Sequence, residues 1–202
     1  MAERNVTRGY GLLERRLAKE RAVMANRLIP ALLRSGRLLD LGCGAYPYFL
    51  MHTDFREKFG LDNIAEKIEG SSISLTRYDL ESETALPFGD NYFDVVTMLA
   101  VLEHIEPGRL ASVLTEIRRV LKPGGLYLLT TPTPSTDKLL RLMAMLKLVS
   151  RHEIEDHKHA YHLDEIVTYL RQAEFQEAQV QRGYFELFMN QWIVAKKEEI
   201  VR

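Results

Sequence analysis

Acidic side chains stand at or just after the ends of several short apolar runs in this sequence, and a glycine-rich turn follows the first. These acids are Asp40, Asp62, Asp79 and Glu103. Gly42 and Gly44, in the stretch LLDLGCGAYP, let the backbone adopt angles that a side chain would forbid and approach a ligand closely. Asp62 lies 18 residues after Gly44, where an acid at a strand end can accept hydrogen bonds from both ribose hydroxyls of a nucleoside. With the ribose there, an adenine would lie near Asp79 and Leu80, so the pattern predicts an adenosine-containing ligand.

Two other nucleotide-binding patterns do not fit this turn. A dinucleotide-binding turn has the spacing G-x-G-x-x-G, and Pro47 stands where its third glycine would be. The phosphate-binding pattern G-x-x-x-x-G-K-[ST] does not occur in the sequence. We therefore expect neither a nicotinamide dinucleotide nor a nucleoside triphosphate at this turn.

Side chains that could remove a proton from a substrate follow the later strands. His104 comes directly after the fourth apolar run, in LEHIEP, where a substrate would approach the sheet, and is our first candidate for a general base. His159, Tyr161 and Tyr10 are further candidates. The alternative is that His104 or Glu103 packs or hydrogen-bonds to loop backbone.

A histidine-rich stretch, RHEIEDHKHAYH, raises the question of a metal site. His157, His159 and His162 fit the spacing H-x-H-x-x-H, which resembles a loop of metal-dependent hydrolases. That motif needs an aspartate where Tyr161 stands, and it should follow an early strand. We therefore expect no metal here and interpret the stretch as a loop that closes over the substrate, with one histidine facing the pocket.

Apolar periodicity predicts the elements that would position these residues. Helical spacing runs over residues 10–33, 46–55, 107–122, 137–149 and 163–175. The β-type runs are RLLDLG, KFGLD, ISLTRYDL, YFDVVTMLAVL and GLYLLTTP, and residues 176–197 hold two more that predict a hairpin. Strands that alternate with helices indicate an α/β fold with a doubly wound, mostly parallel sheet and helices on both faces. Ligands of such sheets bind beyond the carboxyl ends of the strands.

With these motifs in this order, the chain resembles the class I S-adenosylmethionine-dependent methyltransferases, in particular those acting on small molecules. The matching stretches cover roughly residues 38–195: LLDLGCG, FGLD, YDLESETALPFGDNYFDVVTMLAVLEHI, LKPGGLYLLTTP and HAYHLDEIVTYLRQAEF. The resemblance implies S-adenosylmethionine as the cofactor. It also implies a Rossmann-like, seven-stranded sheet that ends in an antiparallel hairpin, which agrees with the last two β-type runs.

The resemblance also implies roles for individual residues. Asp40, Gly42 and Gly44 would line the methionine end of the cofactor, and Asp62, with Asn63 beside it, would hold the ribose. Asp79 would face the adenine amino group, Leu80 would offer its backbone N–H to the ring, and Ala100 and Val101 would lie beneath the cofactor. Tyr46 departs from the pattern, because many members have a third glycine at that position.

Length and composition favour one domain. The chain has 202 residues, a single cysteine and a net charge of −1. We divide it into an N-terminal helical segment (1–37), a cofactor-binding half (38–132), a substrate insertion (133–160) and a C-terminal helix with hairpin (161–202). The first segment carries nine Lys/Arg and three Asp/Glu, so +6. This charge predicts either a solvent-exposed basic helix face, which we favour, or an anionic partner. No signal peptide or apolar membrane span is apparent, and we expect a cytoplasmic protein.

The expected reaction is in-line methyl transfer to an O, N or C atom of a small-molecule acceptor. Seven leucine and methionine residues crowd residues 139–148, which predicts either one wall of a pocket for a lipid-like acceptor or a helix packed on the sheet edge. The region 130–162 resembles that of enzymes with small-metabolite, quinone-like or glycan acceptors. We do not expect nucleic acid to be the substrate, since only the basic first segment favours it. The alternative from another class is a non-catalytic S-adenosylmethionine-binding scaffold.

Overall fold

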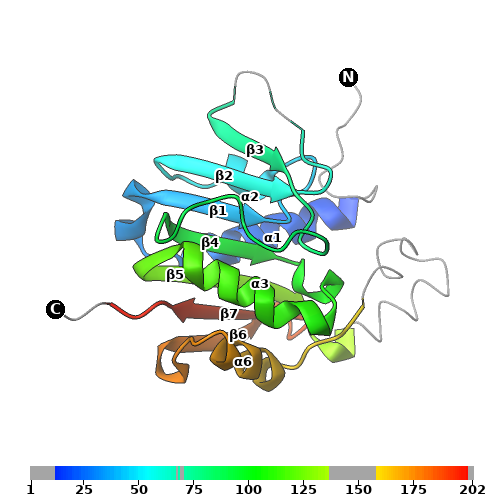
Figure 1. Ribbon diagram of the computed structural model, residues 1–202. Helices are drawn as coiled ribbons and strands as arrows, with labels where there is room; N and C mark the ends of the chain where they lie inside the picture. Colours follow the sequence, from blue (N-terminus) through cyan, green and yellow to red (C-terminus); the bar gives the residue numbers. More distant parts are fainter. Residues whose placement is uncertain (1–11, 67, 69–70, 137–157, 200–202) are drawn as a thin grey trace.

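The computed structural model describes residues 12–66, 68, 71–136 and 158–199, and the backbone alone of residues 12–15. A seven-stranded sheet with the order β3-β2-β1-β4-β5-β7-β6 forms its centre (Figure 1). The strands are β1 Arg37–Leu41, β2 Glu57–Asp62, β3 Ile73–Arg77, β4 Phe93–Leu99, β5 Leu121–Pro132, β6 Val180–Phe185 and β7 Asn190–Lys196. The first five strands are parallel to one another, and β7 is antiparallel to both β5 and β6. The predicted α/β fold with its C-terminal hairpin is confirmed.

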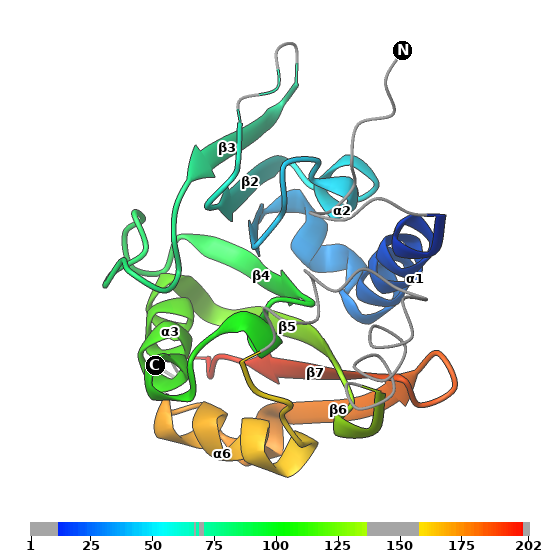
Figure 2. The same ribbon diagram turned by 90° about the vertical axis from the view of Figure 1, so that its right-hand side faces the viewer.

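Helices cover both faces of this sheet (Figure 2). They are α1 Leu12–Leu28, α2 Tyr48–Met51, α3 Pro107–Val120 and α6 Leu163–Gln172, with short 3-10 turns at η1 Ala31–Ser35, η2 Leu102–His104 and η3 Glu177–Gln179. The adjacent residues Leu38 and Leu39 of β1 show the two layers, because Leu38 packs in the cluster with α1 and α2 and Leu39 in the cluster with α3 and α6. Successive strand side chains point to opposite faces, so a strand covered on both sides must be apolar throughout.

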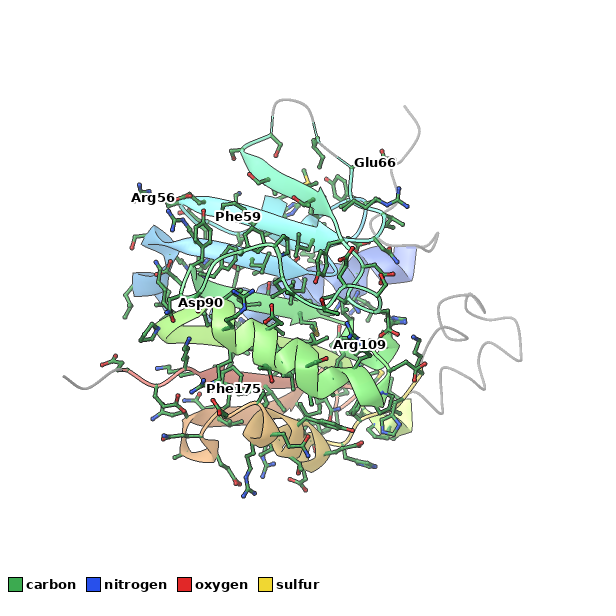
Figure 3. All side chains as sticks on the ribbon, viewed as in Figure 1. Arg56, Phe59, Glu66, Asp90, Arg109 and Phe175 are labelled. Atoms are coloured by element: carbon green, nitrogen blue, oxygen red, sulfur yellow. The ribbon has the colours of Figure 1, made fainter. Side chains whose placement is uncertain are left out.

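An aromatic cluster fastens the chain between β3 and β4 to the α3 face of the sheet. Phe59 of β2, labelled in Figure 3, meets the ring of Phe93 edge to face at 5.4 Å between centroids. Phe88 and Tyr92, from the segment between β3 and β4, contact the ring of Phe59. Edge-to-face packing of this kind stabilises a core beyond the area it buries.

Several predicted boundaries differ from the structure. The helix expected over residues 10–33 ends at Leu28, and η1 follows Pro30, because proline cannot continue the hydrogen-bond ladder of a helix. The helix expected over residues 46–55 is the single turn α2. Helix α3 ends at Val120, so Pro123, Gly124 and Gly125 lie inside β5, beside a shift in register against β4. The helix expected over residues 137–149 lies outside the described residues.

The parallel strands bring their carboxyl ends to one edge of the sheet, at the arrowheads of β1 to β5 in Figure 1. The segments that follow these ends begin at Gly42, Asn63, Tyr78, Ala100 and Thr133. Residues far apart in sequence therefore meet there, which is the edge where the sequence predicts the ligand. Among the described helices, none has the length and hydropathy of a membrane span.

Candidate active site

Asp62, at the end of β2, holds the glycine turn that follows β1. Its Oδ2 accepts a hydrogen bond of 2.9 Å from the backbone N–H of Gly44, and its Oδ1 accepts one of 3.0 Å from Ile64. Gly42 and Gly44 both have left-handed backbone angles, with φ of 74° and 73°. A carboxylate has about four acceptor positions, so two such bonds leave Asp62 capacity for hydroxyl donors of a ligand.

The turns after β1 and β4 touch each other at Gly42. A Cβ atom added to Gly42 would come within 2.2 Å of Cγ2 of Val101. Ala100, beside Val101, also has a left-handed backbone, with φ of 57°. Glycine is therefore required at position 42 both for its backbone angle and for the close approach of the neighbouring turn.

Asp40 is an acid buried inside this edge, with 4% of its surface exposed. Burial raises the pKa of Asp40 to about 7, while the hydroxyl of Thr97, which donates to it at 2.7 Å, lowers that pKa and the negative charge of Asp62 raises it further. No cation is among the described groups that shift this pKa. Two acids that repel each other in this way favour a positively charged ligand.

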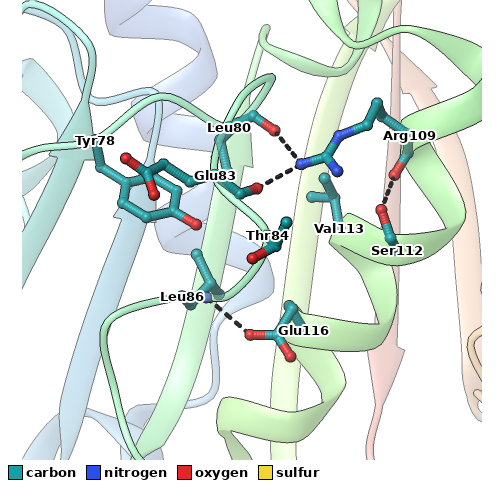
Figure 4. A pocket seen from close by; sticks show the side chains of 9 residues that line it. All are labelled: Tyr78, Leu80, Glu83, Thr84, Leu86, Arg109, Ser112, Val113 and Glu116. Carbon is teal, nitrogen blue, oxygen red and sulfur yellow. Dashed lines mark hydrogen bonds between the residues drawn. The ribbon is translucent and has the colours of Figure 1, made fainter.

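The loop after β3 is held by its own acid and by α3. Asp79 accepts hydrogen bonds from the N–H of Glu81 at 2.9 Å and from the hydroxyl of Ser82 at 3.0 Å. From α3, Arg109 donates to the carbonyl of Leu80 at 3.3 Å and to the carbonyl of Glu83 (Figure 4). The cavity between loop and helix has a volume of only about 10 Å³, enough for about one water molecule. Sequence reasoning missed Arg109, because it looks like an ordinary charged residue near a helix start.

Glu103 ties three segments together. It is 3% exposed, and its carboxylate accepts a hydrogen bond of 3.0 Å from Thr131 on β5. Its backbone carbonyl accepts one of 2.8 Å from the N–H of Lys158, in the segment that leads to α6. These bonds give Glu103 the structural role that was the alternative for it.

The three candidate bases differ in their surroundings. His104 is half-buried in η2, at the carboxyl edge. His159 is also half-buried, and its Nε2 lies 3.0 Å from Oε1 of Glu165, which fixes the orientation of the ring. Tyr161 is fully buried, its hydroxyl donates to the carbonyl of Ile105 at 3.1 Å, and burial raises its pKa. The structure thus places Tyr161 in the core, and its assignment as a base stays a prediction. Tyr10 lies outside the described residues.

A larger cavity, of about 400 Å³, opens beside the carboxyl end of β5 and the β6–β7 hairpin. Hydroxyl groups and aromatic rings share its lining, which is formed by Thr133, Pro134, Ser135, His162, Tyr184, Phe188 and Gln191. Sequence reasoning grouped His162 with the histidine-rich stretch and missed the others, because hairpin and loop side chains carry no motif. Within the described part of the chain, no group of three His, Cys, Asp or Glu side chains is arranged to hold a metal, and His157 lies outside that part.

Known proteins share both the sequence pattern and the fold. A family model described as a methyltransferase domain matches residues 12–180. An uncharacterized methyltransferase of Synechocystis sp. is 43% identical over 96 residues, which are 46% of this chain and 45% of that protein. A ubiquinone/menaquinone biosynthesis C-methyltransferase of Stutzerimonas stutzeri is 37% identical over 84 residues, which are 41% of this chain and 30% of that protein. The chain thus spans less than half the length of these two relatives.

The same fold occurs in a solved S-adenosylmethionine-dependent methyltransferase of Mesorhizobium loti. Its TM-score is 0.66 at 18% identity, and the match covers 90% of this chain and all of that one. At such low identity the likeness concerns the fold alone. The family model, however, covers most of the sequence, including every turn at the carboxyl edge of β1 to β4. The chain belongs to the methyltransferase-domain family.

Proposed function

We propose that this protein is an S-adenosylmethionine-dependent methyltransferase that transfers a methyl group to an O, N or C atom of a small-molecule acceptor. One observation carries the proposal: Asp62 at the end of β2 grips Gly44 in the turn after β1 and leaves acceptor capacity toward the carboxyl edge. Membership of the methyltransferase-domain family supports it. The Stutzerimonas stutzeri relative is named for ubiquinone and menaquinone biosynthesis, which agrees with a lipid-like acceptor.

The residues at this edge fit the cofactor. S-adenosylmethionine carries a sulfonium, whose methyl group is electrophilic, and an ammonium group on its methionine end. Asp40, the turn of Gly42 and Gly44, and Ala100 would hold that end, where the buried acid favours a cation. Asp62 and Asn63 would bind the ribose hydroxyls. Asp79 and Leu80 would hold the adenine, in a loop that Arg109 fastens to α3.

The chain's task in the reaction is mainly to align the acceptor atom, since bringing two reactants into line removes much of the barrier to displacement. We assign the acceptor to the cavity beside β5, where the rings of Tyr184 and Phe188 suit a flat or apolar body and Gln191 and His162 suit a polar end. An oxygen or nitrogen acceptor that must lose a proton would use His104 or His159, and the Glu165 contact suits His159 to that role.

The decisive experiment is calorimetric titration with S-adenosylmethionine. We expect Asp62→Ala to weaken binding at least about tenfold, because charge-assisted hydrogen bonds contribute about 1.5–3 kcal/mol each. Asp54→Ala is the matched control, since Asp54 is exposed in the loop before β2. Circular dichroism would show that both variants are folded. Equal affinity in wild type and Asp62→Ala would refute the ribose assignment.

The alternative function is a scaffold that binds the cofactor without turning it over. S-adenosylhomocysteine release should be measured across acceptor panels that include quinones, lipid-linked phenols and glycans. Turnover that falls in His159→Gln with unchanged cofactor affinity would support catalysis with a base at that position. Cofactor binding with no product for any acceptor would favour the scaffold.

A further inference from the structure

The turn between β6 and β7 exposes large apolar side chains at the carboxyl edge of the sheet. We call Tyr184, Leu187, Phe188 and Met189 the apolar tip. Leu187 is 92% exposed and Phe188 is 73% exposed. Asn190, at the start of β7, pairs with Pro132 at the carboxyl end of β5, so the tip lies at the same edge as the candidate active site (Figure 2). Exposed apolar side chains that gather in one place usually mark an interaction surface.

The backbone of the tip is strained. Glu186, Leu187 and Phe188 all have left-handed backbone angles, with φ of 51°, 54° and 66°. Each such angle costs a residue other than glycine about 1–2 kcal/mol. A strained turn persists only where its surroundings determine it, and it therefore points to a function for the exposed side chains.

Hydrogen bonds within the turn and from Thr133, directly after β5, hold the tip in this shape. The N–H of Met189 donates to the carbonyl of Glu186 at 3.0 Å, and the N–H of Thr133 donates to the carbonyl of Met189 at 3.0 Å. The hydroxyl of Thr133 donates to the carbonyl of Phe188 at 3.2 Å. Several backbone polar groups of the turn are thus already satisfied, which removes a cost of moving the tip into an apolar medium.

Charged side chains of α1 act on Glu186 in the tip, and two of the three are basic. Burial raises the pKa of Glu186, while a hydrogen bond from Asn190 and the charge of Arg21 lower it. Among the weaker charges, Glu20 raises this pKa and Arg16 lowers it. Glu186 itself is half-buried and bonded to Asn190, so it presents little negative charge to the outside. Arg16 is exposed, so a basic side chain of α1 is accessible from outside.

We propose that the apolar tip inserts into the interfacial region of an anionic lipid bilayer, with Arg16 and Arg21 of α1 facing the lipid headgroups. Apolar side chains flanked by basic ones suit such a surface, where each basic residue adds about 1 kcal/mol. A second copy of the chain suits the tip less well, because a two-fold contact centred there would bring the positive charges of both α1 helices together. With the protein docked in this way, the cavity lined by Phe188 and Tyr184 would open next to the bilayer.

The proposal can be tested without any methyl transfer, by co-sedimentation with vesicles. We expect the wild type to sediment with vesicles of phosphatidylcholine and phosphatidylglycerol and far less with phosphatidylcholine alone. Leu187→Asn combined with Met189→Asn should lower the partition coefficient at least about tenfold, because two apolar side chains that the bilayer would bury are lost. Asparagine tolerates the left-handed backbone of position 187.

Two further variants separate the possible outcomes. Leu32→Asn is the matched control, because Leu32 is 77% exposed but lies in η1, before the amino end of β1, and should leave binding unchanged. Arg16→Gln with Arg21→Gln should weaken binding to the anionic vesicles only. The proposal is overturned if wild type and the Leu187/Met189 variant bind vesicles equally, or if neither binds. It is also overturned if sedimentation velocity shows a dimer that this variant abolishes. Cofactor affinity, measured separately, tests the proposed function and not the tip.

Discussion

At the scale of single residues, Asp40 shows how a binding site can cost stability. Its carboxyl group is buried, and its only described hydrogen-bond donor is the neutral hydroxyl of Thr97. The pKa of Asp40, raised to about 7, lies above that of an aspartate in an unfolded chain, which is about 3.9. Between these two values the folded state binds more protons than the unfolded state. The contribution of this group to stability therefore falls as pH rises from about 4 to about 7.

Asp40→Asn should therefore stabilise the protein without ligand at pH 8. Asparagine keeps the oxygen that accepts from Thr97 and removes the buried charge. We expect the melting temperature of the variant to exceed that of wild type by several degrees at pH 8, and the difference to vanish at pH 4. The affinity for S-adenosylmethionine should fall in the same variant, since the acid that favours its cation is gone. Melting curves at several pH values check the first part; a variant less stable than wild type at pH 8 would contradict it.

Sequence patterns predict the types of these residues better than their contacts. The proximity of Asp62 and the glycine turn follows from parallel strands, whose ends meet at one edge. The hydrogen bond from Gly44 to Asp62 does not follow, because it depends on two left-handed turns. Tyr161 was not predictable as a buried residue, since it stands in the histidine-rich stretch. Only the structure shows that it is buried, with its hydroxyl bonded to the carbonyl of Ile105.

At the scale of elements, Arg109 connects α3 to the loop that follows β3. It lies on the side of the loop that carries Asp79 and Leu80, toward the carboxyl end of the strands (Figures 3 and 4). We expect it to act as a positioning residue for the adenine end of the site. The helix was predictable from its apolar stripe, but its connection to this loop was not, because the two contacts are to backbone carbonyls.

Arg109→Met should raise the dissociation constant for S-adenosylmethionine by several-fold. The change removes two hydrogen bonds that the charged side chain donates to the loop, so the loop is no longer held in place. Each such bond contributes up to about 3 kcal/mol to stability. Arg56→Met is the matched control, since the side chain of Arg56 is 76% exposed, at the amino end of β2, with one weak ion pair at 4.0 Å. Calorimetry with adenosine as well as S-adenosylmethionine locates the effect: a loss for both ligands fits an adenine-side role. If Arg109→Met binds S-adenosylmethionine as tightly as Arg56→Met does, Arg109 has no positioning role in cofactor binding.

Element boundaries show where sequence patterns mislead. Pro123, Gly124 and Gly125 look like the end of a helix, yet α3 ends at Val120 and these residues form the irregular start of β5. Gly124 has φ of 75°, and a Cβ on Gly125 would come within 2.8 Å of the carbonyl of Lys122. The two glycines thus allow β5 to bend. In sequence, a bent strand of this kind cannot be told from a loop, because both contain proline and glycine.

At the scale of the whole molecule, the order of strands and helices was predictable because each element is apolar with a clear period. Five parallel strands and a C-terminal hairpin then admit few arrangements, since crossovers between parallel strands are right-handed. The cavity beside β5 was not predictable, because it is made where the hairpin, the end of β5 and the start of α6 meet. Acceptor choice depends on that region, which is why fold and cofactor do not define the substrate.

Cofactor binding should stabilise this whole arrangement, because the proposed site joins the ends of four strands. A ligand at about 100 times its dissociation constant adds about 2.7 kcal/mol to the free energy of unfolding, which corresponds to about 5–10 °C in melting temperature for a chain of this size. We expect S-adenosylmethionine and S-adenosylhomocysteine to produce such a shift. Adenosine, which lacks the ammonium group that Asp40 favours, should produce a smaller one. NADH should produce none, since Pro47 stands where a dinucleotide-binding turn has glycine. A shift with NADH but not with S-adenosylmethionine would mean that the strand-end acids serve a different nucleotide.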